Sequence, residues 1–304
     1  MFFLSFFVTL EEECSSLCGK ESDFYMQKPA RVLTIAGSAP RGSAGIQADL
    51  KTFQELDVYG MSVVTAVVSR HPETNKNVHP LTMEAVEAQF DNAVHEVGVD
   101  ALKVGMLFSV EIINRVAELI ASYPFEHVII DPVMVGKLDS KLLADDAVDA
   151  LREEILPLAT IITPNMPEAS ILLGDRTLRT LDDIKQAAID LHEKGVQNVL
   201  VKGGRLQGPA VDVLYDGKTL TTFEAPRIDT VNTNGAGCSY ASAIAAYIAR
   251  GKSIQEAVHL AKRFITTAIE HSFSYTDIVG PTYHAALRLK GEAHPIKVEQ
   301  IQYP

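Results

Sequence analysis

Residues 198–226, NVLVKGGRLQGPAVDVLYDGKTLTTFEAP, contain the two patterns that decide the fold. The first part, NVLVKGG, is a short apolar run without polar alternation. A strand of this kind is covered on both faces, as in a parallel sheet packed between helices. The second part has two strand-like runs on either side of Asp216-Gly217, a dipeptide typical of tight hairpins. The stretch therefore predicts a parallel sheet followed by an antiparallel edge.

The same strand type recurs upstream and alternates with helical patterns. Further strands are expected at RVLTIAG (31–37), MSVVTAVVS (61–69), DALKVGM (100–106), HVIIDPV (127–133) and ATIITPN (159–165). Helical periodicity is found at 45–56, 83–97, 109–123, 180–195, 235–250 and about 253–271. This alternation predicts an α/β fold with helices on both faces of a mostly parallel central sheet. We expect one domain over 29–290, with an N-terminal extension (1–28) and a C-terminal tail (291–304).

The composition is that of a globular enzyme. The 304 residues are 47% hydrophobic and 22% charged, which is enough apolar chain for one large core. The net charge of −12 disfavours nucleic-acid binding, because a protein that contacts a phosphate backbone carries a basic face. The three cysteines, Cys14, Cys18 and Cys238, form no even framework, so we expect a reducing, cytoplasmic location.

The N-terminal run MFFLSFFVTL (1–10) is apolar but too short to span a bilayer, and it lacks a basic flank. The chain turns acidic where a cleavage site would stand. The segment is interpreted either as a poor signal peptide or as a translated upstream extension, with Met26 as the functional start. We expect no membrane partner.

Ligands of open parallel sheets bind beyond the carboxyl ends of the strands, where strand-to-helix loops converge. The loop GSAPRGSAG (37–45) places Gly37, Gly42 and Gly45 ahead of a helix, where backbone N–H groups can approach a ligand closely. The loop has neither of the common phosphate-loop spacings. A flexible strand-to-helix turn is therefore an equal alternative.

Two later loops suggest a site for magnesium and phosphate. TPNMPEA (163–169) sets Asn165 and Glu168 three residues apart, where an amide and a carboxylate could hold hydrated Mg²⁺. The alternative is a helix start with an acidic first turn. Lys202 ends a strand and precedes two glycines, which suits a phosphate contact, although a solvated turn lysine has the same pattern. Asp131, Asn165 and Lys202 follow or end neighbouring strands, which favours a common site.

A glycine turn leads into an alanine-rich helix at NGAGCSYASAIAA (234–246). Gly235 and Gly237 would leave N–H groups free at the helix N-terminus, which carries partial positive charge and suits an anion. Cys238 is expected there to favour its thiolate relative to the ordinary pKa of about 8.5, and so to accept a proton from a substrate hydroxyl. Such positioning and charge neutralisation suit phosphoryl transfer. The alternative is a small buried cysteine that packs the helix start.

Taken together, the motifs resemble a known family. AGS…GSAGIQADLKTF, KVGML, DPVMV, ITPNMPEA, VKGG and NTNGAGCSYASAIAA are similar to motifs of the ribokinase-like vitamin kinases. The branch is that of hydroxymethylpyrimidine/phosphomethylpyrimidine kinases and the pyridoxal kinases of Gram-positive bacteria, and the resemblance covers residues 31 to about 290. It implies a ribokinase-like three-layer α/β/α sandwich, a homodimer, and ATP and Mg²⁺ as cofactors, with a monovalent cation as a further option. The implied reaction transfers the γ-phosphate to a hydroxymethyl group on a pyrimidine or pyridine ring.

By motif position, the resemblance also assigns roles to single residues. Those implied in catalysis are Gly235, Ala236, Gly237 and Cys238. Those implied in cofactor binding are Asn165, Glu168, Lys202, Gly203, Gly204 and Asp212, with Asp131, Asn165 and Glu168 around the metal. Those implied in binding the acceptor are Gly37, Ala39, Gly45, Arg70, Met106 and Val133.

Four positions depart from the family pattern. Ala39 replaces an aspartate in a loop that faces the substrate, and Arg70 stands where glutamine or methionine is usual. Gly136 replaces the flap cysteine of the pyridoxal kinases, and Asn234 replaces the histidine before the glycine turn. The nucleotide-binding motifs are intact, so the reaction type is better determined than the acceptor.

Three functions stay open. A kinase for pyridoxal, pyridoxine and pyridoxamine is favoured by FQELDVYGM and VGPTYHAALRL, which resemble the pyridoxal kinases. A hydroxymethylpyrimidine or phosphomethylpyrimidine kinase is the second, and Arg70 could pair with an acceptor that already carries a phosphate. The third is a degenerate paralogue that binds a vitamin or nucleotide without turnover. Cys238 argues against the third, because a pure binding protein needs no proton acceptor.

Overall fold

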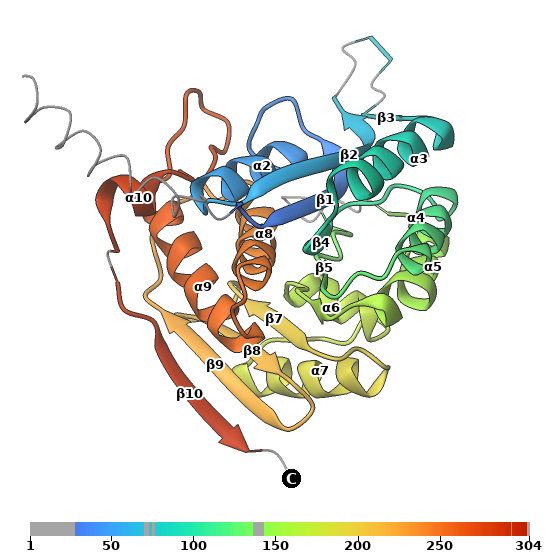
Figure 1. Cartoon of the computed structure of the whole chain (residues 1–304). Coiled ribbons are helices and arrows are strands. Elements are labelled where there is room, and N and C mark those ends of the chain that lie inside the picture. The colour runs from blue at the N-terminus through green and yellow to red at the C-terminus, as the bar shows by residue number, and fades with distance from the viewer. Residues whose placement is uncertain (1–27, 70–72, 75–76, 136–142, 293, 303–304) are drawn as a thin grey trace, which may run out of the picture.

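The computed structural model describes residues 28–69, 73–74, 77–135, 143–292 and 294–302. Its ten-stranded sheet has the order β10-β9-β8-β7-β6-β5-β4-β1-β2-β3 (Figure 1). The strands are β1 (Arg31–Ser38), β2 (Tyr59–Val68), β3 (Val78–Pro80), β4 (Ala101–Val104), β5 (Val128–Ile130), β6 (Ile161–Ile162), β7 (Val199–Gly203), β8 (Ala210–Tyr215), β9 (Thr219–Ala225) and β10 (Lys297–Gln302). Strands β1, β2 and β4 to β7 pair in parallel, whereas β3 and β8 to β10 pair antiparallel at the two edges. The predicted mostly parallel sheet with an antiparallel edge is confirmed.

Helices cover both faces of this sheet. They are α2 (Ile46–Glu55), α3 (Met83–Asp91), α4 (Val110–Ser122), α5 (Asp145–Ala150), α6 (Met166–Leu172), α7 (Leu181–Glu193), α8 (Ala236–Ala249), α9 (Ile254–Glu270) and α10 (Ala286–Lys290), with shorter turns η1 (Asn92–Val97), η2 (Leu151–Ile155) and η3 (Leu156–Leu158). In Figure 1, α2, α8 and α9 lie on one side of the sheet and α3 to α7 on the other. Successive residues of β1 reach different layers, because Leu33 and Ile35 belong to one hydrophobic cluster and Val32 to the other. Burial on both faces explains why the strand sequences are apolar throughout.

Local side-chain chemistry defines the predicted hairpin. Asp216 Oδ1 accepts the backbone N–H groups of Lys218 and Thr219 at 2.9 and 2.7 Å. Gly217 has a φ of +89°, a conformation that side chains disfavour. The turn joins β8 and β9 as an antiparallel pair, as the sequence predicted.

Other elements were not predicted. All six residues of β10 are exposed, yet the strand pairs with β9 from Lys297 opposite Glu224 to Gln302 opposite Thr219. The expected tail 291–304 thus adds a strand to the sheet. The helical pattern at 83–97 is divided, because α3 ends at Asp91 and continues as the π-helical turn η1.

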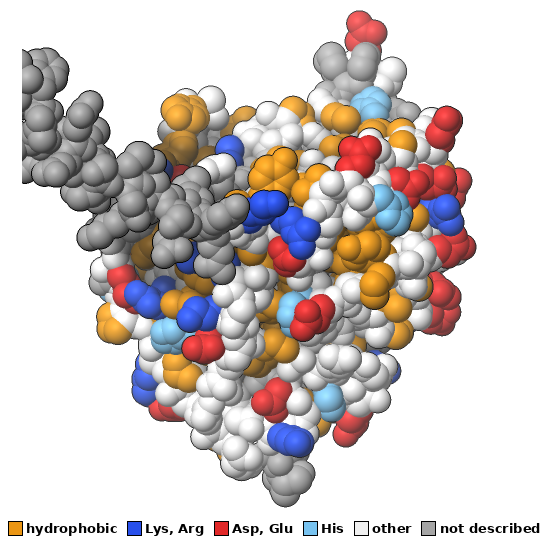
Figure 2. Space-filling view, in the orientation of Figure 1, with side chains coloured by type: hydrophobic (Ala, Val, Ile, Leu, Met, Phe, Trp, Pro, Cys, Tyr) orange, Lys and Arg blue, Asp and Glu red, His pale blue; other side chains and the backbone are white. Residues whose placement is uncertain are grey.

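No helix within the described ranges is long and apolar enough to cross a bilayer. On the face shown in Figure 2, basic side chains stand among acidic ones and form no extended basic surface.

Candidate active site

A cavity of about 350 Å³ lies at the carboxyl ends of the parallel strands, against the start of α8. It brings together most of the site residues predicted from the sequence: Gly37, Ala39, Gly45, Met106, Asp131, Val133, Asn165, Glu168, Lys202, Gly235, Ala236, Gly237 and Cys238. Gly203, Gly204 and Asp212 are not among its lining residues. Arg70 lies outside the described residues. The strand-to-helix loops therefore converge where the parallel sheet predicted a ligand site.

A partly buried lysine and a buried aspartate join the ends of β5 and β7. Lys202 Nζ lies 2.7 Å from Asp131 Oδ1, which also accepts the hydroxyl of Thr163 at 3.0 Å. Burial alone would lower the pKa of Lys202, but the charges of Asp131 and Glu168 raise it instead. The lysine is therefore a fixed positive charge in the cavity wall, which suits a bound phosphate.

Asn165 and Glu168 form a capping box at the start of α6. Asn165 Oδ1 accepts the Glu168 N–H at 3.0 Å, and Glu168 Oε2 accepts the Asn165 N–H at 2.8 Å. The interpretation as an acidic helix start is thus confirmed, and both residues still line the cavity. Burial raises the pKa of Glu168 to about 7; Lys202 opposes this and Asp131 adds to it. Burying Glu168 close to Asp131 places two acidic groups where a cation would lower their repulsion.

The glycine turn before α8 packs directly on the first loop. Gly235 has a φ of +80°, and a Cβ there would stand 1.6 Å from the carbonyl oxygen of Ser43. A Cβ on Gly45 would stand 2.2 Å from the carbonyl oxygen of Gly37. Only glycine permits these backbone contacts. The loop at 37–45 is therefore a closely fitted wall of the cavity.

The ionisation predicted for Cys238 is wrong. The residue lies in the first turn of α8 and lines the cavity, but burial raises the pKa of its thiol to about 11. Lys103 lowers this pKa, and the carboxylates of Asp131 and Asp49 raise it. The helix N-terminus supplies only a partial charge, which is smaller than the combined cost of burial and two nearby carboxylates. Cys238 is a neutral thiol at pH 7.

Lys103 is a site residue that the sequence did not single out. It lines the cavity from β4 and has no solvent exposure, and its Nζ lies 2.8 Å from Asp49 Oδ2. Thr34 donates to the same oxygen and Ser242 to the other, each at 2.7 Å. A lysine within the otherwise apolar run DALKVGM was the available signal. Arg205 lines the cavity as well.

Asp212 has a different setting from the one expected. It is buried in β8, where its Oδ2 lies 2.6 Å from Lys262 Nζ and its Oδ1 accepts the N–H of Gly203 at 3.0 Å. A Cβ on Gly203 would stand 2.0 Å from the carbonyl oxygen of Val211. Asp212 therefore orders the end of β7 from behind the cavity.

Two of the four departures from the family pattern can be placed. Ala39 lines the cavity, and its N–H donates to Gln47 Oε1 at 2.8 Å. Asn234 Nδ2 donates to Ser43 Oγ at 2.7 Å, which joins the glycine turn to the first loop. Arg70 and Gly136 lie outside the described residues.

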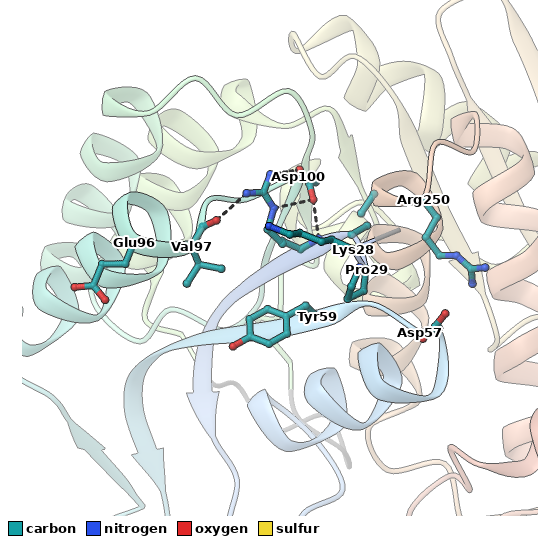
Figure 3. Close-up of a pocket in the computed structure, with 11 residues that line it drawn as sticks. Lys28, Pro29, Asp57, Tyr59, Glu96, Val97, Asp100 and Arg250 are labelled. Carbon is teal, nitrogen blue, oxygen red and sulfur yellow. Dashed lines mark hydrogen bonds and ion pairs between the residues drawn. The ribbon is translucent and has the colours of Figure 1, made fainter. Parts of the chain in front are cut away.

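A larger cavity, of about 980 Å³, lies at the opposite end of the sheet, around the starts of β1 and β2 (Figure 3). Its arginines are held by the protein itself: Arg31 pairs with Asp100 at 2.6 Å, and Arg250 donates to the carbonyl of Leu56 at 3.0 Å. None of the predicted site residues that the structure describes lines it. The smaller cavity is therefore the candidate active site.

Comparison with known proteins identifies the family of this chain. A family model described as phosphomethylpyrimidine kinase matches residues 40–283. Pyridoxine kinase of Bacillus subtilis (strain 168) is 47% identical over 267 residues, which are 86% of this chain and 98% of that protein. Hydroxymethylpyrimidine/phosphomethylpyrimidine kinase of the same organism is 43% identical over 260 residues, 85% of this chain and 96% of that protein. The structure of pyridoxal kinase from Staphylococcus aureus in complex with AMP-PCP and pyridoxal has a TM-score of 0.82 and 40% identity, covering 91% of this chain and all of that one. The chain therefore belongs to the phosphomethylpyrimidine kinase family and is a phosphotransferase with a ribokinase-like fold.

Proposed function

We propose that this protein transfers the γ-phosphate of ATP to the hydroxymethyl group of pyridoxal, pyridoxine or pyridoxamine. The observation that carries the proposal is the convergence of Lys202, the glycine turn and Cys238 on one cavity. The 47% identity to a pyridoxine kinase supports the choice of acceptor, as does the likeness to a pyridoxal kinase whose structure contains a nucleotide analogue and pyridoxal.

The start of α8 supplies donors for a transferred phosphoryl group. The N–H of Ser239 makes the first helical bond, to the carbonyl of Gly235 at 2.9 Å, and the N–H of Ala236 donates to Thr233. The N–H groups of Gly237 and Cys238 are thus the helix-terminal donors that point to an anion. Donors fixed before the reaction stabilise charge on the phosphoryl oxygens without rearranging. Ala236 was predicted as part of the anion hole, but its N–H is used within the turn, where it donates to the carbonyl of Thr233.

Cys238 acts on the acceptor as a neutral thiol. In a loose phosphoryl-transfer transition state the acceptor oxygen gains little bonding early, so its proton need not leave before the transfer begins. The thiol orients the acceptor hydroxyl by a hydrogen bond. As the bond between the γ-phosphoryl group and ADP breaks and the new P–O bond forms, the hydroxyl proton passes to an oxygen of the transferred phosphoryl group.

The oxygen donors of the cavity fit Mg²⁺. Asp131, Asn165 and Glu168 offer carboxylate and amide oxygens, the ligands that Mg²⁺ prefers. Within the described residues no three His, Cys, Asp or Glu side chains are grouped closely enough to hold a metal by themselves. This suits an ion that keeps several waters and binds substrate phosphates. Asp131 and Glu168 would hold Mg²⁺, which would supply neutralisation of phosphate charge. A monovalent cation remains a further prediction.

A hydroxymethylpyrimidine or phosphomethylpyrimidine kinase is the second candidate, favoured by the family model and by the relative at 43% identity.

A homodimer and a cytoplasmic location stay predictions. Light scattering on the purified protein would test the first, and fractionation of the native host would test the second.

The deciding experiment measures ADP release from ATP and Mg²⁺ with each of five acceptors. These are pyridoxal, pyridoxine, pyridoxamine, hydroxymethylpyrimidine and its monophosphate. We expect turnover with the B6 vitamers. Turnover with the pyrimidines alone would replace the proposal by the second candidate. Intact ATP binding with no turnover on any acceptor would replace it by a non-catalytic binding protein.

A further inference from the structure

A buried histidine lies behind the glycine turn, on the side away from the cavity. His284 belongs to the C-terminal segment that precedes α10 and is 7% exposed. Its Nε2 lies 2.9 Å from the hydroxyl oxygen of Ser239, the residue that follows Cys238. Ser239 is fully buried, and the same oxygen lies 2.9 Å from the carbonyl oxygen of Gly235. The glycine turn, α8 and the C-terminal segment thus meet at the hydroxyl group of Ser239.

The hydrogen count orients this chain of contacts. A serine hydroxyl has one hydrogen, and the Gly235 carbonyl can only accept. When Ser239 donates to Gly235, His284 must carry its hydrogen on Nε2 and donate to Ser239. This assignment pairs Nε2 of His284 and the hydroxyl of Ser239, and the Gly235 oxygen then accepts from both the N–H and the hydroxyl of Ser239. The peptide that follows Gly235 is thereby fixed in direction.

The same C-terminal segment holds the other side of the turn. Gly280 accepts the N–H of Asn234 at 3.1 Å, and its own N–H donates to Asn232 Oδ1 at 2.8 Å. Residues 280–284 therefore contact the chain both before and after Gly235. The position of the turn depends on this segment as well as on α8.

We propose that His284 is a positioning residue for phosphoryl transfer: through Ser239 it fixes the Gly235 carbonyl, and with it the N–H groups of Gly237 and Cys238. The proposal rests on the proposed function of the site. His284 is not among the described residues that line the cavity, so it acts through the turn and not on the nucleotide or the acceptor.

The electrostatic surroundings keep this histidine neutral. Burial, together with the charge of Lys51 of α2, lowers the pKa of His284 to about 4, and Glu55 of α2 opposes the shift. Ser239 on α8 contributes no charge. The imidazole of His284 therefore stays neutral between pH 6 and pH 9, and its contact with Ser239 does not change over that range.

The test compares His284→Ala with His284→Gln, whose amide N–H can take the place of Nε2–H, and with Ser239→Ala. Thr282→Val is the matched control, because Thr282 is buried in the same segment and its hydroxyl has no hydrogen-bond partner among the described residues. We expect kcat to drop about 10- to 100-fold in H284A and S239A, since small displacements of positioned groups have effects of this size. The Kd for ADP should stay within about twofold of wild type in each.

H284Q should recover most of the lost kcat, and T282V should match wild type. Hydrogen exchange in the ligand-free protein gives a second readout: amides at 235–240 should exchange faster in H284A and at the wild-type rate in T282V. Unchanged kcat in H284A, or equal losses in H284A and H284Q, would overturn the proposal. If the wild-type protein shows no turnover, the proposed function fails, and faster exchange confined to 235–240 would still identify His284 as the support of the turn.

Discussion

The buried ion pair between Lys103 and Asp49 yields a sharp prediction about stability. Neither side chain has solvent exposure, and Nζ lies 2.8 Å from Oδ2. The substitution K103M keeps an unbranched side chain but leaves the Asp49 carboxylate buried without its cation. Breaking a buried pair in this way costs about 3–5 kcal/mol. We expect K103M to lose that much of the free energy of unfolding, out of the roughly 5–15 kcal/mol typical of a domain.

Neighbouring groups do not compensate for the missing charge. The hydroxyls of Thr34 and Ser242 already donate to Asp49, and they carry no charge. Burial alone would lower the pKa of Lys103, but Asp49 and other acidic groups raise it from 10.5 to about 12. A raised lysine pKa stabilises the fold fully below pH 10.5 and loses this effect as the pH rises through 12. Lys103 is therefore charged throughout the range from pH 6 to pH 9, and the wild-type ion pair is complete at both pH values.

Urea unfolding followed by circular dichroism would measure wild type, K103M, D49N and the double variant. Each single substitution leaves the other partner's charge buried and unpaired, whereas the double substitution leaves no unpaired charge. The double variant should therefore lose about 1–3 kcal/mol less than the sum of the singles. K290M, at an exposed position, is the control and should stay within about 0.5 kcal/mol of wild type. A K103M loss below about 1 kcal/mol, or additive losses in the double variant, would refute the reasoning.

Three further outcomes concern the site itself. Cys238→Ala should lower kcat about 10²-fold with unchanged ATP affinity, measured by ADP release and calorimetry, because the acceptor hydroxyl loses the group that positions it; full turnover would show that Cys238 only packs the start of α8. In a C14S/C18S background, alkylation of Cys238 should accelerate up to pH 10 because its pKa is about 11, and a plateau below pH 9 would contradict this. Gly235→Ala should lower kcat at least about 10²-fold, because its Cβ would strike Ser43, whereas Gly251→Ala, with the same φ of +80° but open space, should stay active.

The sequence predicted those secondary-structure elements that are determined by residues within the element itself. The hairpin at Asp216-Gly217 follows from turn chemistry, and the central strands follow from apolar runs. Strand β10, KVEQIQ, carries no such pattern because all its residues are exposed, and it forms by pairing with β9. The π-helical turn after Asp91 was also missed, because the apolar periodicity continues through it.

The sequence predicted those cavity residues that belong to a motif at the end of a strand. It did not predict properties that depend on residues far apart in the sequence. Asp131, Asn165 and Lys202 were expected to share a site, and they do. The pKa of Cys238 was misjudged because it is set by burial and by Asp131 and Asp49, which lie far away in the sequence. The role of Lys103 stayed hidden for the same reason, since its partner comes from another element.

The central place of α8 in the fold has a consequence for synthesis of the chain on the ribosome. Val32, Ala101 and Ile129 of the early strands pack in the same cluster as the alanines of α8. Until residues 236–249 have left the exit tunnel, that face of the sheet has no such cover, and apolar surface exposed in this way promotes aggregation. Chains cut short before α8 should therefore be insoluble, and the glycine turn at 235–237 can take up its place in the fold only after residues 236–249 have been synthesised.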